Sequence, residues 1–222
     1  MSEISDQHKT VLDNLAAASK RAGGPPSDLV AVSKVQPDAL IKEMLKTGQR
    51  IYGENRVQEA QTRWGETFAD HREGLELRLI GPLQTNKAAD AVVLFDVIET
   101  VDREKLLKAL VKAVGDDGTM PRLYVQVNTG EEDQKSGVLP ADLPAFLKTM
   151  RETYNLEPEG LMCIPPMGEA ASPHFWMLSN LAKANAVKKL SMGTSGDYEI
   201  AADMGATSVR VGSALFGPRD YG

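Results

Sequence analysis

Apolar residues recur along this chain with two spacings. Ile4, Val11 and Leu15 fall on one face of a helix, and the pattern stops at Gly23. Beyond it, short β-branched or aliphatic runs alternate with longer amphipathic stretches, separated by Gly, Pro, Asn or Asp. The short runs predict strands at residues 29–34, 50–53, 76–81, 97–101, 122–128, 160–164, 189–192 and 208–212. The longer stretches predict helices near residues 38–46, 57–68, 86–94, 103–114, 143–153, 174–186 and 198–204, with a short one after residue 213.

Strands that alternate with helices in this way form parallel sheets, either a closed (β/α)8 barrel or an open doubly wound sheet. Eight strands favour the barrel, which requires about 200 to 250 residues, and the chain has 222. The first strand is followed by Val-Gln-Pro, without the Gly-rich turn of a dinucleotide-binding fold. We therefore predict a single α/β barrel domain over residues 1–222, with residues 1–24 forming an N-terminal helix packed on the barrel.

Composition narrows the functional classes. Apolar residues make up 42% and charged residues 25%, as in ordinary globular proteins, and no apolar run approaches the roughly 18 residues of a membrane span. The excess of 31 acidic over 25 basic residues argues against nucleic-acid binding. The lone Cys163 and the absence of a signal-peptide pattern favour the cytoplasm. His8, His71 and His174 lack metal-ligand spacing, so no metal site is expected.

In such a barrel the functional residues gather at the carboxyl ends of the strands. Lys34 ends the first predicted strand. If it points inward, desolvation favours the neutral amine, a nucleophile toward aldehydes; otherwise Lys34 is an ordinary solvated lysine. Asn55 follows the second strand on the same side of the barrel, where it either faces a ligand or caps the next helix.

The last two strands are followed by glycines beside hydroxyl residues. Gly193 and Ser195 follow the seventh strand, and Gly212 and Ser213 the eighth. These turns predict a phosphate site, because (β/α)8 barrels often hold phosphate at those two loops. The alternative is that Ser195 and Ser213 simply cap the helices that follow, each worth roughly 1 kcal/mol.

Arg210 lies between Val209 and Val211, so strand alternation turns it away from the face that the two valines occupy. A buried guanidinium needs a partner, which is either a ligand or a structural carboxylate. Together, a strand-end lysine, a phosphate cradle and an inward arginine describe a pyridoxal 5′-phosphate site.

Six segments of the chain carry a resemblance to a known family. They are Leu-Val-Ala-Val-Ser-Lys at 29–34, Tyr-Gly-Glu-Asn-Arg-Val-Gln-Glu at 52–59, Ile-Gly-Pro-Leu-Gln-Thr-Asn-Lys at 80–87, Gln-Lys-Ser-Gly-Val at 134–138, Gly-Leu-Met at 160–162, and the stretch from Leu-Ser-Met-Gly at 190–193 to Phe-Gly at 216–217. With these segments the sequence resembles the pyridoxal phosphate homeostasis protein family.

The resemblance implies a barrel like the N-terminal domain of alanine racemase and assigns the site residues. The cofactor would form a Schiff base with Lys34, Arg210 would face its pyridine nitrogen, and Asn55 would lie nearby. The residues assigned to the strand-seven and strand-eight turns are Met192, Gly193, Ser195, Gly212 and Ser213, of which Ser195, Gly212 and Ser213 would hold the phosphate.

Two positions depart from the family pattern. Arg78 stands where the family usually has His, which we expect to add a cation near the barrel mouth. Thr194 stands where it usually has Met, which we expect to add a hydroxyl beside the phosphate.

Members of the resembled family are regarded as cytosolic, often monomeric carriers or regulators of pyridoxal phosphate, without established turnover. The resemblance thus implies a cofactor-binding protein with no catalytic residues and with pyridoxal-phosphate-dependent apoenzymes as partners. One alternative is an amino-acid racemase. This needs a second base, which the resembled racemases take from a separate β domain that we do not expect here. Candidates for that base are Tyr52, Tyr124, Tyr154, Tyr198 and Tyr221, none within a motif. The other alternative is a Schiff-base aldolase acting on sugar phosphates.

Overall fold

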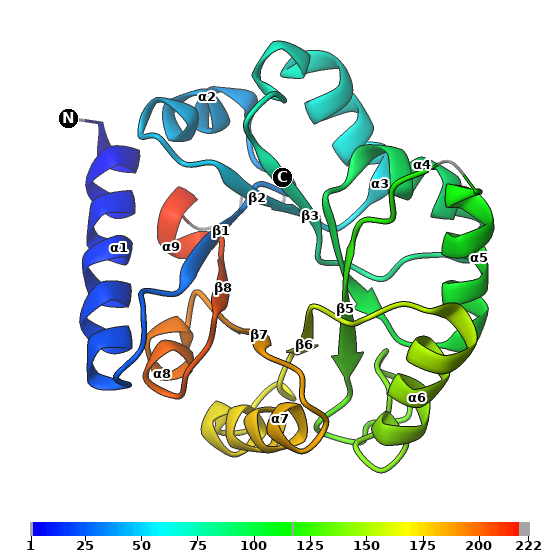
Figure 1. Ribbon diagram of the computed structural model, residues 1–222. Helices are drawn as coiled ribbons and strands as arrows, with labels where there is room; N and C mark the ends of the chain where they lie inside the picture. The colour runs from blue at the N-terminus through cyan, green and yellow to red at the C-terminus, as the bar shows by residue number, and fades with distance from the viewer. Residues whose placement is uncertain (1, 117, 218–222) are drawn as a thin grey trace.

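The computed structural model describes residues 2–116 and 118–217. Within these residues, eight parallel strands form a closed barrel in which each strand pairs with the next and β8 pairs with β1 (Figure 1). The predicted (β/α)8 barrel is therefore confirmed. The strands are β1 (Asp28–Val32), β2 (Ile51–Glu54), β3 (Glu76–Leu79), β4 (Val97–Val101), β5 (Arg122–Val127), β6 (Gly160–Cys163), β7 (Lys189–Thr194) and β8 (Ser208–Val211).

Helices surround the strands in a ring (Figure 1). The α-helices are α1 (Glu3–Arg21), α2 (Asp38–Lys46), α3 (Val57–Ala60), α4 (Ala88–Leu94), α5 (Glu104–Val114), α6 (Leu143–Tyr154), α7 (Ala171–Ala184), α8 (Tyr198–Asp203) and α9 (Ser213–Phe216). A π-helix, η1 (Gln61–Thr67), continues α3, and two 3₁₀ turns, η2 (Ala69–His71) and η3 (Thr85–Lys87), complete the set.

The predicted and observed elements differ mainly at their ends. The first strand stops at Val32 rather than at residue 34, because the chain turns at residues 34 and 35. The seventh strand continues to Thr194, two residues beyond its predicted end. The helix predicted at residues 57–68 is only partly α-helical, since its second half is the π-helix η1.

The helix at the N-terminus packs outside the barrel, against α8, α9 and α2. Its buried face includes Val11 and Leu15, as the spacing predicts. Arg21, in its last turn, donates to both carboxylate oxygens of Asp203 in α8, at 2.8 Å each. None of the helices within the described residues combines the length and apolar character that a bilayer crossing requires.

The two faces of the barrel differ in chemistry. Outward-facing residues such as Val209 and Val211 join the main apolar core between the strands and the helices. A small separate apolar cluster consists of Val97, Tyr124 and Met162. Alternation places these three on the interior face, together with fully or almost fully buried polar side chains of Arg78, Glu99, Ser191 and Arg210. The interior of this barrel therefore contains charged side chains that are shielded from water.

Candidate functional site

Lys34 and Asn55 lie at the carboxyl ends of two neighbouring strands. Lys34 follows the last residue of β1 by two positions, Asn55 directly follows β2, and both are partly buried. The backbone of Asn55 touches the turn after β3, where a methyl group at Gly81 would lie 2.3 Å from the Asn55 carbonyl oxygen. The absence of a side chain at Gly81 therefore lets this turn lie directly against a predicted site residue.

The turns after β7 and β8 are joined by one hydroxyl. The Oγ atom of Ser195 accepts the backbone N–H of Gly212 at 3.0 Å and that of Ala214 at 3.3 Å. Gly193 has a φ of 93°, which favours glycine, and a Cβ there would lie 2.5 Å from that of Ala201. The two loops thus present backbone N–H groups and a hydroxyl in one small region.

Neither serine caps the helix that follows its own strand. These helices begin after Asp197 and Gly212, and neither cap residue forms a side-chain capping bond. Ser195 lies before the cap position of α8 and bonds the other loop instead. Ser213 is exposed as the first residue of α9.

Met192 and Thr194, in the same turn as Gly193 and Ser195, do not point their side chains toward a ligand in the same way. Met192 is fully buried in the main core, so its backbone rather than its side chain can face the mouth. The Thr194 hydroxyl, expected beside a phosphate, donates to Asp197 Oδ1 at 3.0 Å. The Thr194 N–H donates to the same oxygen at 2.6 Å, so this residue serves the turn itself.

Arg210 has turned inward, as alternation predicts, and is 4% exposed. Its Nη1 donates to Ser191 Oγ at 2.6 Å, and its Nη2 donates to the carbonyl oxygen of Cys163 at 2.8 Å. Ser191 in turn donates to the fully buried Glu99 at 2.6 Å, and Glu99 lies 3.9 Å from the guanidinium. The buried Arg210 therefore does have a structural carboxylate, Glu99, as a partner. Since these hydrogen bonds among the described residues use two of five guanidinium N–H groups, donors remain for a ligand.

Arg78 does not lie near the mouth, contrary to the expectation. Its guanidinium is almost fully buried and pairs with Glu99 at 3.1 Å, Glu76 at 2.5 Å and Asp28 at 3.7 Å. Glu76 and Asp28 are the first residues of β3 and β1, so the cation faces the amino-terminal half of the barrel. Burial alone would lower the pKa of Arg78, but Glu99 and Glu76 outweigh that effect and raise it.

Sequence reasoning missed Glu99 and Ser191, which link Arg78 to Arg210 across the barrel interior. A signal for Glu99 did exist, because it interrupts the otherwise uncharged strand Val-Ile-Glu-Thr-Val. A charge in such a strand must be paired when it is buried.

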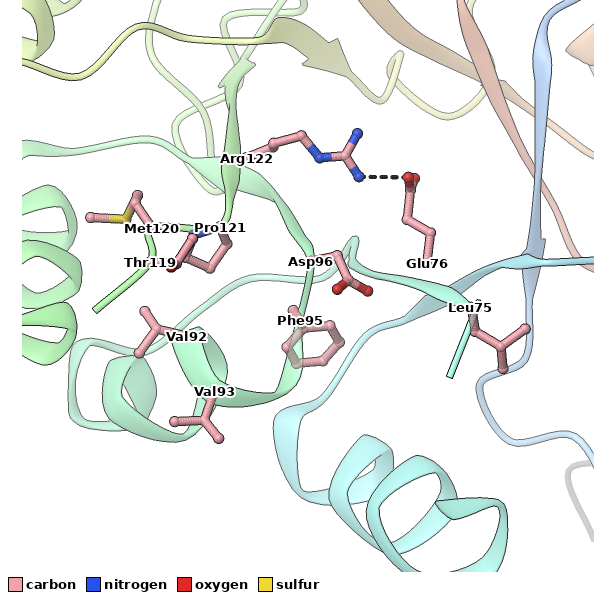
Figure 2. Close-up of a pocket in the computed structure, with 11 residues that line it drawn as sticks. Leu75, Glu76, Val92, Val93, Phe95, Asp96, Thr119, Met120, Pro121 and Arg122 are labelled. Carbon is pink, nitrogen blue, oxygen red and sulfur yellow. Dashed lines mark hydrogen bonds and ion pairs between the residues drawn. The ribbon is translucent and has the colours of Figure 1, made fainter. Parts of the chain in front are cut away.

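Two cavities lie at opposite ends of the barrel. One of about 280 Å³ opens at the carboxyl ends of β3, β5 and β6, between Ile80, Asn128 and Lys135. The other, of about 570 Å³, lies where β3 and β5 begin (Figure 2). There Arg122 reaches across to Glu76, with their charged atoms 2.5 Å apart (Figure 2). Neither cavity is lined by any of the predicted site residues, so cavity size does not locate the site.

The tyrosines within the described residues do not supply a base at the mouth. Tyr52 packs against Trp64 outside the barrel, with the ring planes tilted by 49°, and Tyr124 pairs with Gly160 at the start of β6. The hydroxyl of Tyr154 donates to Glu104, and that of Tyr198 accepts from Asn14 of α1. The fifth candidate, Tyr221, lies outside the described residues. The same part of the chain contains no cluster of His, Cys, Asp or Glu suited to a metal ion.

Comparisons with known proteins place the chain in a family. The family model for the alanine racemase N-terminal domain matches residues 8–220. A pyridoxal phosphate homeostasis protein of Pseudomonas aeruginosa is 40% identical, over all of this chain and 98% of that protein. The structure of PipY from Synechococcus elongatus PCC7942 with PLP bound superimposes with a TM-score of 0.82 and 34% identity, over 97% of this chain and 100% of PipY.

A more distant structure shows the fold alone. Alanine racemase from Bartonella henselae has a TM-score of 0.74 and 15% identity, over 97% of this chain and 58% of the racemase. The fold and the family model thus define a barrel of the alanine racemase type. With the full-length identity to the Pseudomonas relative, the chain belongs to the family of pyridoxal phosphate homeostasis proteins.

Proposed function

We propose that this protein binds pyridoxal 5′-phosphate reversibly on Lys34 and serves the homeostasis of that cofactor. The observation that carries the proposal is that Lys34, Arg210 and the Ser195–Gly212 turn belong to three adjacent strands of the barrel, β1, β8 and β7, or to the turns that follow them. The homologous PipY, whose structure has PLP bound, supports the same ligand.

The donors in this region fit the cofactor. Its phosphate needs several N–H and O–H donors, which Gly212, Ala214, Ser195 and Ser213 offer. The two N–H groups that now donate to Ser195 Oγ are able to donate to phosphate oxygens instead. The buried guanidinium of Arg210 suits the acceptor nitrogen of the pyridine ring. Asn55 would line the site, as would the backbone of Met192 and Gly193.

The chemistry of the bound state is simple. Bound pyridoxal phosphate would supply an aldehyde. The Lys34 amine would form a C=N bond to the aldehyde carbon, and the oxygen would leave as water with the two amine hydrogens. An arginine does not give up its proton at physiological pH, so Arg210 would leave the pyridine nitrogen unprotonated. A neutral ring is a weak electron sink for carbanion chemistry, which disfavours transamination.

The finer parts of the proposal follow from this role. We assign the whole chain, residues 1–222, to one cofactor-binding domain, with residues 1–24 packed on the barrel. The protein would act without turnover, as a monomer in the cytoplasm, and its partners would be apoenzymes that use pyridoxal phosphate. The names of its relatives, which are homeostasis proteins, support this view. Incorporation of solvent deuterium at the α-carbon of amino acids at a catalytic rate would favour the racemase instead.

The direct test is the visible absorption spectrum of the protein with added pyridoxal phosphate, followed by borohydride reduction and peptide mapping. We expect a violet band in the wild type, a reduced adduct on Lys34, and loss of both in Lys34→Ala. Lys135→Ala is the matched control, since Lys135 lies beside the neighbouring mouth cavity. An adduct on another lysine, or no adduct, would contradict the proposal and favour an aldolase acting on sugar phosphates.

A further inference from the structure

The turn that carries Lys34 has an unfavourable backbone conformation. Val35, the next residue, has a φ of 59°. This left-handed region is disfavoured for a β-branched side chain. Burial does not hold Val35 there, because it is 58% exposed. Other contacts must therefore keep the turn in this shape.

One arginine binds both sides of the turn. Arg63 Nη1 donates to the carbonyl oxygen of Ser33 at 2.6 Å, and its Nη2 donates to that of Gln36 at 2.8 Å. These two carbonyls flank Lys34 and Val35 in the sequence. Arg63 is 9% exposed, so its two hydrogen bonds are largely shielded from competing water.

Two carboxylates complete the contacts. Glu54, fully buried at the end of β2, accepts from Ser33 Oγ at 2.6 Å and from Arg63 Nη1 at 3.0 Å. Glu59 Oε1 accepts the backbone N–H of Val35 at 2.5 Å and lies 3.3 Å from Arg63 Nη1. We call Arg63, Glu54 and Glu59 the turn clamp, because they bind the backbone or side chains of Ser33, Val35 and Gln36.

The local fold explains how the clamp is presented. Arg63 belongs to the π-helix η1, which begins two residues after Glu59. From this helix both Arg63 and its neighbour Trp64 reach Glu54, the latter through Nε1 at 3.1 Å. Single π-helical turns are rare and are frequently found at functional sites.

We propose that Arg63, with Glu54 and Glu59, is a positioning residue that holds the strained turn so that the Lys34 amine meets the ligand aldehyde. The inference rests on the proposed function. Without the clamp the turn relaxes toward ordinary backbone angles, and the amine moves away from its position of attack. The phosphate and ring are bound by β7 and β8, which the clamp does not touch. Covalent capture therefore depends on the clamp, whereas non-covalent binding does not.

The test compares two ligands on the full chain. Pyridoxal phosphate reports covalent capture, as the rate at which a borohydride-reducible adduct forms on Lys34. Pyridoxine 5′-phosphate has an alcohol in place of the aldehyde and reports non-covalent affinity alone. For Arg63→Met we expect capture to fall by about tenfold or more, since displacements near 1 Å have such effects, with the affinity for pyridoxine phosphate changed less than about threefold.

A second pair of variants guards against misfolding of Arg63→Met, which leaves Glu54 buried without its cation. Glu59→Ala removes the acceptor of the Val35 N–H, and Glu59→Gln restores an oxygen at the same place. We expect slow capture in the first and near wild-type capture in the second. Trp64→Phe is the control, because it removes a donor to Glu54 and keeps an aromatic ring against Tyr52.

Failure of the positioning role and failure of the proposed function give different results. Wild-type capture rates in folded Arg63→Met and Glu59→Ala would overturn the positioning role. A parallel loss of pyridoxine phosphate affinity in Glu59→Ala would also overturn it, because that loss indicates a general structural role. If the wild type itself forms no adduct on Lys34, it is the proposed function that fails.

Discussion

The side-chain oxygen of Ser195 accepts the backbone N–H of Gly212 at 3.0 Å, so one hydroxyl joins the turn after β7 to the start of α9. The N–H of Ala214 donates to the same oxygen at 3.3 Å. In a barrel whose phosphate sites usually lie at these two loops, the same N–H groups are available to an anionic oxygen. We therefore expect a ligand's phosphate to be held beside the Ser195–Gly212 contact.

Replacing Ser195 by Ala should weaken phosphate binding specifically. Loss of one hydrogen bond to a charged group costs about 1.5 to 3 kcal/mol, so we expect the affinity for pyridoxine 5′-phosphate to fall by about tenfold or more. Affinity for pyridoxine itself, measured by the same titration calorimetry, should not change. Thr194→Ala is the control, since the Thr194 hydroxyl donates to Asp197. Equal losses in the two variants would contradict this assignment.

The close approach of Gly81 to Asn55 predicts a steric effect. A Cβ at position 81 would lie 2.3 Å from the Asn55 carbonyl oxygen and 2.7 Å from its Cα. Gly81→Ala must displace that backbone, and overpacking of this kind costs about 1 to 3 kcal/mol. Urea unfolding should show the loss. Gly24→Ala, where a Cβ meets nothing within 4 Å, should leave the free energy of unfolding nearly unchanged.

Sequence patterns predicted those features that depend on alternation and strand order. Period two alone predicts Arg210 on the face opposite Val209 and Val211, and the carboxyl-end rule predicts that Lys34 and Asn55 follow the ends of two paired strands. The position of Arg78 was mistaken, because a strand residue's height in a barrel depends on strand tilt and register as well as on its order along the chain.

The turn clamp could not have been predicted from the sequence. Nothing in the residues 33–36 indicates a left-handed Val35, since β-branched residues avoid that conformation unless tertiary contacts impose it. The π-helix of Arg63 is likewise rare, and the residues 57–68 predict an ordinary α-helix. Both features arise from contacts between segments that are some 20 to 30 positions apart.

The thiol of Cys163 should be unreactive in the folded protein. Burial raises its pKa to about 12, although the charge of Arg210 acts in the opposite direction. Since the thiolate is the reactive species, we expect almost no reaction with dithionitrobenzoate in mildly alkaline buffer. In denaturant the single cysteine should react fully. Rapid reaction of the native protein would show that the end of β6 opens to solvent.

Removing one partner of the Arg78 ion pairs should lower the free energy of unfolding strongly, because a buried charge is then left without its counter-charge. Arg78→Met leaves the fully buried Glu99 without its closest cation. Breaking a buried pair in this way costs about 3 to 5 kcal/mol, measured by chemical denaturation. The double variant with Glu99→Gln should recover part of the loss, because the uncompensated charge is then gone. A double variant with the summed cost of both single changes would mean that the two side chains do not interact.

The pKa values of Glu76 and Glu54 are shifted in opposite directions, so protonation of Glu76 should destabilise the protein in acid, and ionisation of Glu54 should destabilise it at higher pH. Burial favours the neutral form of Glu76, but Arg78 and Arg122 outweigh it and hold the pKa below its ordinary value of 4.5. Stability from Glu76 is therefore present above pH 4.5 and is lost as the pH falls through the lowered pKa.

Burial instead raises the pKa of Glu54 above 4.5, against the effects of Arg63 and Ser33. The stability linked to Glu54 is greatest below pH 4.5 and is lost as the pH rises through the raised pKa. Urea unfolding across this range should show Glu76→Gln flattening the acid limb of the stability curve and Glu54→Gln flattening the opposite limb. If Glu76→Gln left the acid limb as steep as in the wild type, the ion pairs with Arg78 and Arg122 would not be the source of the acid sensitivity.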